Sequence, residues 1–338
     1  AKYVNINGYQ NQIKNSGGTA LTSWTPETTN TSYTFVSNTS NNLEIKQNTK
    51  YIVSMRAVDL AGNYKDSSKT ITTQIAANAP KLTTGMIPVK YNVTSKKWVI
   101  CSPTDPEWYS YTVTDKKWAN VMLCDGTYDT STAVGTQVAE EDLGSMFVWI
   151  PRYAYMITDG YHSTNGSLDV IFVNGTSYKY ADTTGTVQTA KNGNVEGVIT
   201  EEGYTDYVIH PAFANGKSNG YSNGEWRQEI EGLWVAKFQA GFATTDKDVS
   251  QTVQIASSTS SPTAGATVYY PIFKGRKFAY NYVTPSQCYD LSLAVDDSGN
   301  PYGLTTGANS HLMKNSEWGA MVYLTWSKYG RNRTEPNI

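Results

Sequence analysis

The sequence has little charge and no strongly basic segment. Charged residues make up 17% of its 338 residues, the formal net charge is −2, and no run rich in lysine or arginine occurs. Nucleic-acid binding depends on a basic surface, so this composition argues against a DNA- or RNA-binding protein. No apolar stretch approaches the roughly 20 residues of a membrane-spanning helix. The first residues do not resemble a signal peptide, and the chain begins as if processed or cut from something longer.

Cysteine is also scarce. Cys101, Cys124 and Cys288 are far apart and form no Cys-x-x-Cys pair, which excludes zinc ribbons and thioredoxin-like redox motifs. Cys101 and Cys124 flank two tryptophan-bearing strands and could pair in an oxidising compartment. Two buried free thiols are the expected alternative, because free cysteine behaves as a small apolar residue. One cysteine stays unpaired in either case.

The chain is instead rich in Ser, Thr, Asn, Gly and aromatic residues, with 25 tyrosines and 9 tryptophans. A charge-poor surface of hydroxyls, amides and tyrosines is common in extracellular β-proteins. We therefore expect a mainly β chain with an α+β C-terminal domain, located outside the cell.

Residues 1–76 read as short strands separated by polar turns. Alternation of apolar and polar side chains predicts strands at 51–58 and 69–73, joined by a turn at 59–63. Tyr51, Val53, Met55 and Ala57 are expected on one half-buried face. Residues 77–84 contain a proline and no periodic pattern, so they are predicted to be a linker.

Residues 45–51 resemble the tyrosine-corner motif of fibronectin type III and related Ig-like modules. Ile45 and Gln47 stand where that family usually has leucine and proline. The resemblance implies a β-sandwich for residues 1–76, in which the Tyr51 hydroxyl bonds to nearby backbone, with the role of a spacer.

Two helices are predicted in residues 85–338. Thr284 is placed as N-cap and Pro285 at the first helical position of the first helix. The second starts near Asn315 or Ser316, with Glu317 in its first turn and Gly330 as its stop. The expected buried positions are Cys288, Leu291 and Val295 in the first helix, and Trp318, Met321, Val322 and Thr325 in the second. Strands are expected at 146–157, 168–173, 205–210, 233–239 and 267–281, with long loops at 159–167, 181–203, 214–228 and 243–266.

The order of these elements is similar to the C-type lectin fold, in the branch shared by formylglycine-generating enzymes and the variable proteins of diversity-generating retroelements. That branch has a helix opened by Arg-Leu-Pro-Thr-Glu-Ala-Glu-Trp-Glu. Leu312, Glu317 and Trp318 fall on the motif's Leu, second Glu and Trp. The resemblance covers about residues 85–330 and implies that Trp318 is sealed under a twisted β-layer. It also implies a domain, residues 85–338, that is incomplete at its C-terminus, because the branch builds its ligand surface after this helix.

The resemblance extends to uncharacterised surface or phage-borne proteins of gut Firmicutes, which place Ig-like modules ahead of such a domain, and it implies a location on a bacterial cell surface or a virion. Formylglycine-generating enzymes bind copper through two cysteines that follow the motif helix. No cysteine follows Cys288 here, so the thiolates that copper needs are missing. We therefore expect no enzyme activity, no cofactor, and no catalytic or metal-binding residues.

Several polar groups remain as weaker candidates. His162, His210 and His311 could form a metal or acid–base cluster, but each is expected to be a lone hydrogen-bonded or surface histidine. Residues 335–337 spell Glu-Pro-Asn, a calcium and sugar motif of some C-type lectins, with a frayed tail as the alternative. Residues 140–142 are acidic and fit a solvated turn better than a cation site. Aromatic residues in or beside long loops suit sugar stacking or protein contact, and these are Tyr204, Tyr207, Tyr221 and Trp226.

The expected function is that of a non-enzymatic extracellular adhesion or display protein, whose ligand is a protein or glycan of a host cell or other surface. The ligand-binding residues stay unassigned. The alternative is a structural subunit of a filament or pilus-like assembly, in which neighbouring copies complete exposed strand edges. A formylglycine-generating-type oxidase is a distant third reading.

Overall fold

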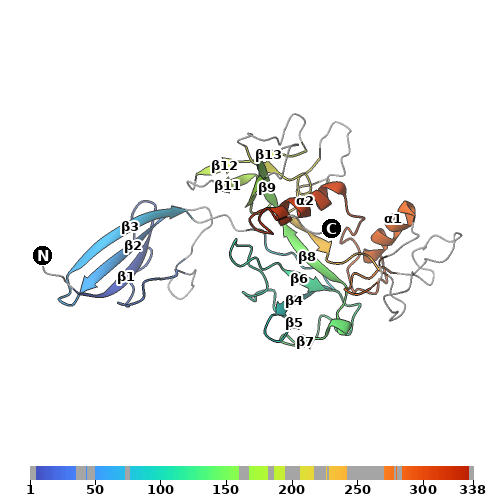
Figure 1. Ribbon diagram of the computed structural model, residues 1–338, viewed down its shortest axis with the longest axis horizontal. Coiled ribbons are helices and arrows are strands. Elements are labelled where there is room, and N and C mark those ends of the chain that lie inside the picture. Colours follow the sequence, from blue (N-terminus) through green and yellow to red (C-terminus); the bar gives the residue numbers. More distant parts are fainter. Residues whose placement is uncertain are drawn as a thin grey trace. The chain divides into compact units, whose positions relative to one another are not determined.

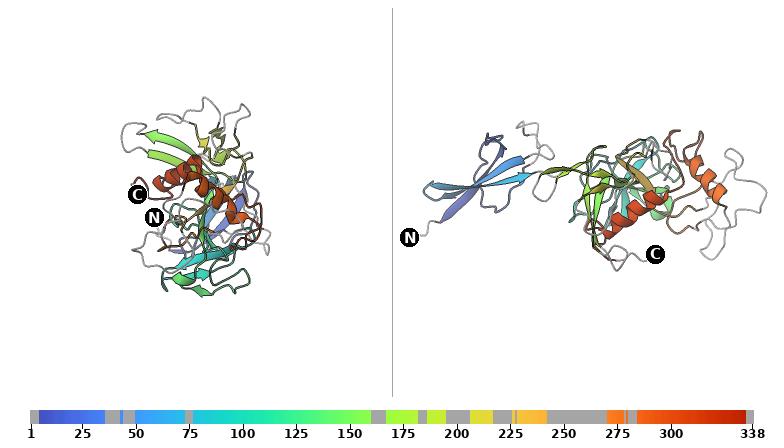
Figure 2. Two further views of the ribbon diagram at one scale, coloured as in Figure 1. Left: turned by 90° about the vertical axis from the view of Figure 1, so that its right-hand side faces the viewer. Right: turned by 90° about the horizontal axis from the view of Figure 1, so that it is seen from above.

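The computed structural model describes residues 5–35, 43, 50–72, 77–159, 167–181, 186–194, 206–216, 226, 228–241, 270–277, 279 and 284–334. These residues form a mainly β structure whose two α-helices lie near the C-terminal end (Figures 1 and 2). Within this described part, no helix has both the length and the apolar character needed to cross a membrane.

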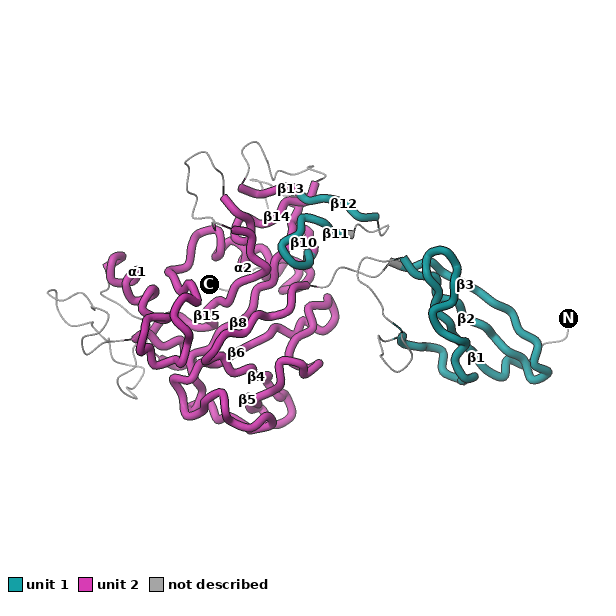
Figure 3. The backbone as a smooth tube through the Cα atoms, turned by 180° about the vertical axis from the view of Figure 1, so that it is seen from behind, with its two compact units in different colours: residues 1–76, 172–190 teal, residues 77–171, 191–338 magenta. Residues whose placement is uncertain are grey.

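The chain divides into two compact units, residues 1–76 with 172–190 and residues 77–171 with 191–338 (Figure 3). Residues 172–190 fall within the predicted C-terminal domain, residues 85–338. They carry a hairpin of β11 (Lys179–Ala181) and β12 (Val187–Thr189), which form a two-stranded sheet of their own among the described residues. The hairpin also shows that part of the predicted loop at 181–203 is strand.

The first unit contains an antiparallel sheet of β1 (Ile6–Asn15), β2 (Lys50–Asp59) and β3 (Tyr64–Thr72), in that order. The predicted hairpin between β2 and β3 is present. The Asp59 carboxylate accepts hydrogen bonds from the backbone N–H groups of Ala61 and Asn63, both at 2.8 Å. This Asx-type turn explains why the two strands end where they do.

Only one end of this sheet is well buried. Ile13, Leu43 and Tyr51 form its core, with Phe35 packed against them. Residues 44–49 of the predicted tyrosine corner lie outside the described residues. Met55 was expected on the half-buried face but is exposed, and so is every residue of β3 from Tyr64 to Ile71. No second sheet made of described residues covers this strand.

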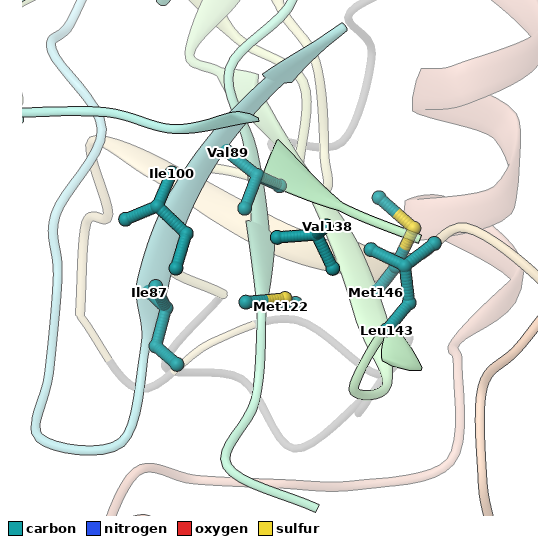
Figure 4. Packing of buried hydrophobic residues seen from close by; sticks show 7 residues of the cluster. All are labelled: Ile87, Val89, Ile100, Met122, Val138, Leu143 and Met146. Atoms are coloured by element: carbon teal, nitrogen blue, oxygen red, sulfur yellow. The ribbon is translucent and has the colours of Figure 1, made fainter. Parts of the chain in front are cut away.

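The second unit is built on a six-stranded antiparallel sheet. Its strands are β4 (Ile87–Asn92), β5 (Lys97–Ile100), β6 (Asn120–Met122), β7 (Gln137–Val138), β8 (Met146–Pro151) and β15 (Gly232–Ala236). Their spatial order is β15-β8-β6-β4-β5-β7, as Figure 1 shows for the central strands. Both faces are covered over much of the sheet. One face carries the cluster of Figure 4, which includes Val89, Met122 and Met146; the other packs Val121 and Trp149 against Trp108.

The predicted strand at 146–157 is two strands that belong to different sheets. β8 ends at Pro151, and β9 (Tyr153–Asp159) joins a four-stranded sheet with β10 (Ser167–Phe172), β14 (Val208–Ile209) and β13 (Lys191–Asn192). Arg152 lies at the corner between them and is fully buried. Its Nη1 donates to the carbonyls of Phe213 and Ile230 at 2.6 and 3.3 Å, and lies 2.7 Å from a carboxylate oxygen of Glu229.

Helix α1 (Pro285–Leu293) begins as predicted and continues into the short 3₁₀ turn η3 (Ala294–Asp296). Thr284 Oγ1 accepts from the Gln287 N–H, and Gln287 Oε1 accepts from the Thr284 N–H, which is a reciprocal capping box. Leu291 and Val295 are buried and Cys288 is half-buried, in agreement with the predicted stripe.

Helix α2 (Asn315–Trp326) buries a different face from the predicted one. Its buried residues are Glu317, Ala320 and Leu324, while Trp318 is 54% exposed. The expectation that Trp318 is sealed under a β-layer is therefore wrong. The helix presents this face to the protein interior because the Glu317 carboxylate pairs with His311 and the Tyr153 hydroxyl donates a hydrogen bond to the Ala320 carbonyl. After the helix, a Cβ on Gly330 would lie 2.2 Å from the Thr325 carbonyl oxygen, so only glycine fits there.

The segment predicted to be a linker belongs to the second unit. Asn78 is buried, its side chain donates to the Glu231 carbonyl, and its own carbonyl accepts from the Trp149 indole at 3.0 Å. The Trp234 indole donates to the Lys81 carbonyl at 2.6 Å. Sequence periodicity could not show this, because the segment is held by hydrogen bonds to its backbone and not by an apolar pattern.

One further difference concerns a predicted strand, and one further feature is a pair of similar turns. In the described part of the predicted strand at 267–281, only isolated bridges occur, at Ile272 and Ala279. Two segments of similar sequence, Ser95–Trp98 and Asp115–Trp118, form similar turns: Lys96 and Lys116 occupy equivalent positions, with φ of 54° and 47°. Lysine in the left-handed region is uncommon, which makes the shared conformation a specific likeness.

Candidate ligand-binding surfaces

His210 is a buried, uncharged residue, and in the part of the chain that the structure describes it belongs to no metal-binding cluster. It is 4% exposed, surrounded by the rings of Tyr153, Tyr155 and Tyr323 at 5.4–5.5 Å between centroids. Its Nδ1 accepts from the Ala212 N–H at 3.2 Å, which places the proton of the neutral imidazole on Nε2. Burial lowers the pKa of His210 to about 3.

His311 lies at the start of α2 in an ion pair with Glu317. Its Nε2 is 2.9 Å from Glu317 Oε1, and its Nδ1 is 2.7 Å from the Asn309 carbonyl. Both ring nitrogens therefore face acceptors, as an imidazolium requires. The hydrogen bond to Glu317 raises the pKa of His311. The pair stabilises the fold below the ordinary histidine pKa, and this contribution is lost as the pH rises through the raised value.

Glu317 also caps its own helix, since its other carboxylate oxygen accepts from the Lys314 N–H at 2.9 Å. The Lys314 ammonium lies 4.2 Å from the centre of the Trp226 ring, and this ring contacts His311 edge-on. Trp226 is thus part of the support of α2. These contacts give His311 and Glu317 a structural role and leave no ring nitrogen to act on a substrate.

The other candidate positions are dispersed. Residues 140–142 form the 3₁₀ turn η2 (Glu140–Asp142), in which Asp142 accepts from the Thr127 hydroxyl at 2.8 Å. The Tyr207 hydroxyl donates to Asp169, which also pairs with Lys328 at 2.7 Å. Among the described residues, no group of three or more His, Cys, Asp or Glu side chains could hold a metal ion. The candidates that lie outside the described residues are His162, Tyr204, Tyr221 and the triplet at 335–337.

All three cysteines are free thiols, so Cys101 and Cys124 do not pair. Burial raises the pKa of Cys101 to about 12, and burial also raises the pKa of Cys124. The Cys124 thiol lies 3.4 Å from the Gly85 carbonyl and donates to it. Thiolate is the reactive form of cysteine, so neither residue is poised for nucleophilic or redox chemistry.

The start of α2 carries an exposed apolar surface that the sequence analysis does not identify. It consists of Leu312, Met313 and Trp318, which are 47%, 38% and 54% exposed; we call it the helix-start surface. Met313 precedes the N-cap and Trp318 is the fourth helical residue, the two positions of a hydrophobic staple. That spacing was the available signal in the sequence, since a staple residue packs along the helix and not into the core.

The helix-start surface has a rigid base. The Glu317 side chain caps the helix and forms an ion pair with His311, and Leu324 is buried. The Tyr153 hydroxyl donates a hydrogen bond to the Ala320 carbonyl at 2.6 Å. A large aromatic side chain on such a base loses little conformational freedom when it binds a partner.

Comparison of the chain with protein-family models, with curated proteins and with solved structures finds no match.

Proposed function

We propose that the chain is a non-enzymatic extracellular binding protein of the adhesion or display type, on a bacterial surface or a phage tail. The single observation that carries the proposal is the exposure of Trp318 together with Leu312 and Met313 on a rigid helix start. Exposed apolar groups gathered in one place mark interaction sites, and tryptophan is among the residues that contribute most to interface affinity. The low charge of the chain fits an extracellular surface.

An Ig-like module in residues 1–76 and a C-type-lectin-like fold in residues 85–338 belong to this proposal. Glu317 supports the second assignment, because it caps α2 from the position of the motif's second Glu. The exposure of Trp318 counts against it, because the resemblance implies a buried tryptophan. The adhesion role therefore rests on the helix-start surface and not on the lectin resemblance.

The Trp318→Ser variant tests the proposal. Fluorescently labelled chain is added to bacterial and epithelial cells and to a glycan array, and retained fluorescence is measured. We expect W318S to lose retention about tenfold or more, the scale of an interface hot spot. Tyr289→Ser is the matched control, because Tyr289 is also 54% exposed but lies on α1. Equal losses in the two variants, or no retention of the parent chain on any surface, would contradict the proposal.

A second candidate is a filament subunit assembled by strand addition, and the exposure of β3 favours it. β3 is an edge strand with β2 as its one strand partner in the described sheet. Lys65 and Lys69 lie on β3, and edge lysines oppose pairing with another copy. If copies join at this edge, sedimentation velocity should show concentration-dependent assembly that K65T/K69T strengthens. Lys50→Thr, on β2, is the control. A monomer at all concentrations for both variants contradicts this candidate.

A further inference from the structure

On the face of the six-stranded sheet that carries Val89, Lys237 lies beside the half-buried ring of Trp98, which contacts the exposed Tyr91, and it has no acidic partner among the described residues. Asn120 lies opposite Val148, and Val148 lies opposite Val235, so these three residues form a row across β6, β8 and β15. Lys237 follows two residues after Val235 and is still paired, since its N–H donates to the Met146 carbonyl at 2.9 Å. Strand alternation therefore puts Lys237 on the same face as Asn120.

The Lys237 ammonium lies 4.3 Å from the centre of the Trp98 ring and donates to Asn120 Oδ1 at 3.1 Å. The orientation of the Asn120 amide is set by its own nitrogen, which donates to the Trp118 carbonyl at 2.7 Å. Trp98 lies opposite Tyr91 on β4, with 5.5 Å between ring centroids in an edge-on arrangement. Tyr91 is 50% exposed and Lys237 is exposed.

The charge of Lys237 is not neutralised within the described residues. Other lysines of the second unit form short ion pairs with carboxylates, for example Lys90 with Asp105 at 2.7 Å. Among the described residues, the Lys237 ammonium contacts an amide oxygen and an aromatic ring but no carboxylate, and desolvation lowers its pKa. An ammonium has three donor hydrogens, and an amide oxygen accepts only one of them, so donors remain for a ligand.

We propose that Tyr91, Trp98, Asn120 and Lys237 form a binding site for a sugar that carries a carboxylate. The Lys237 ammonium pairs with the carboxylate, and the exposed Tyr91 ring, with the half-buried Trp98 beside it, packs against the C–H groups of the sugar ring. Aromatic side chains combine apolar faces with polar edges, which suits a sugar, and a cation partly removed from water binds an anion more strongly. This site lies on the sheet face, and it does not depend on the helix-start surface.

The probe is glucuronate, with glucose as the neutral sugar of the same ring shape, and binding to the whole chain is measured by saturation-transfer NMR and titration. We expect glucuronate to bind with a dissociation constant on the order of millimolar, at least about tenfold tighter than glucose, and more weakly as salt is added. Lys237→Met should lower the glucuronate affinity about tenfold, so that the preference for glucuronate over glucose is lost.

Lys97→Met is the matched control, because Lys97 is the neighbour of Trp98 in β5 and is exposed on the opposite face. K97M should change the affinity less than about twofold, the size of a screened surface charge. Lys237→Gln repeats the test with a polar side chain, and circular dichroism checks that each variant is folded. Equal affinity for the two sugars, no binding of glucuronate, or equal losses in K97M and K237M would overturn the proposal. The W318S variant should bind glucuronate normally, so failure of the adhesion proposal and failure of this one can be told apart.

Discussion

The second unit should lose stability as the pH falls from 6.5 towards 3, and His210 should be a main cause. An unfolded histidine takes up a proton near pH 6.5, whereas burial holds the pKa of His210 at about 3. Between these values the unfolded state binds one more proton, so the free energy of unfolding falls by about 1.4 kcal/mol per pH unit. The total is on the order of a few kcal/mol.

Urea unfolding followed by tryptophan fluorescence measures this effect, because every tryptophan except Trp24 lies in residues 77–338. His210→Asn removes the titrating group and keeps an acceptor for the Ala212 N–H, which His210 Nδ1 provides now. The variant should be less stable at pH 7, since it leaves a cavity among the aromatic rings, but its stability should vary much less between pH 7 and pH 5. An unchanged pH slope in H210N would show that His210 is not the titrating group.

Replacement of Arg152 should have the largest effect of any single change. Arg152→Met leaves the Glu229 carboxylate without its cation and removes the donor to the Phe213 carbonyl. Loss of one member of a buried ion pair costs about 3–5 kcal/mol, because the remaining charge loses its partner while still partly removed from water; Glu229 is half-buried, so we expect the lower end of this range. The midpoint of urea unfolding should therefore drop steeply, together with the near-ultraviolet circular dichroism of the second unit.

The control for Arg152 is the ion pair of the first unit. Arg56 bonds Asp66 through two nitrogens at 2.8 and 3.0 Å, but Asp66 is largely exposed to solvent. Arg56→Met should lower the midpoint of urea unfolding far less than R152M, because water and salt screen an exposed pair. Adding Glu229→Gln to R152M should recover part of the lost stability. A loss in R152M as small as that in R56M would show that the corner between β8 and β9 does not depend on this arginine.

Local signals in the sequence predicted local structure well. The β2–β3 hairpin follows from alternation and the Asp59 turn, and α1 follows from Thr284, Pro285 and the apolar stripe of Leu291 and Val295. In each case the residues that decide the structure lie within a few positions of one another. The mainly β character follows from the same patterns.

Predictions that depended on distant contacts were wrong. Trp318 belongs to an apolar face by its spacing, but the face that α2 buries is set by Glu317, which is held by His311. The sequence at 146–157 predicts one strand, because its pattern does not show that Arg152 is buried. Arg152 is buried by its hydrogen bond to the Phe213 carbonyl and its ion pair with Glu229. Residue types alone do not show such pairings across long stretches of sequence.

The proposed sugar site could not be predicted from the sequence for the same reason. Trp98 and Lys237 are 139 positions apart in the chain (237 minus 98), and they meet only through the folding of one sheet in which β8, β6 and β4 lie between β15 and β5. Each residue on its own fits an ordinary strand.

The way that Asn78 and Lys81 are held decides where a gene fragment for the second unit has to begin. A fragment that starts at Gly85 removes both carbonyl acceptors, and the indole N–H groups of Trp149 and Trp234 are left without them. An expression boundary at Ala77 keeps these two hydrogen bonds. Residues 77–84, which have no periodic pattern, thus supply the hydrogen-bond acceptors for two tryptophans of β8 and β15.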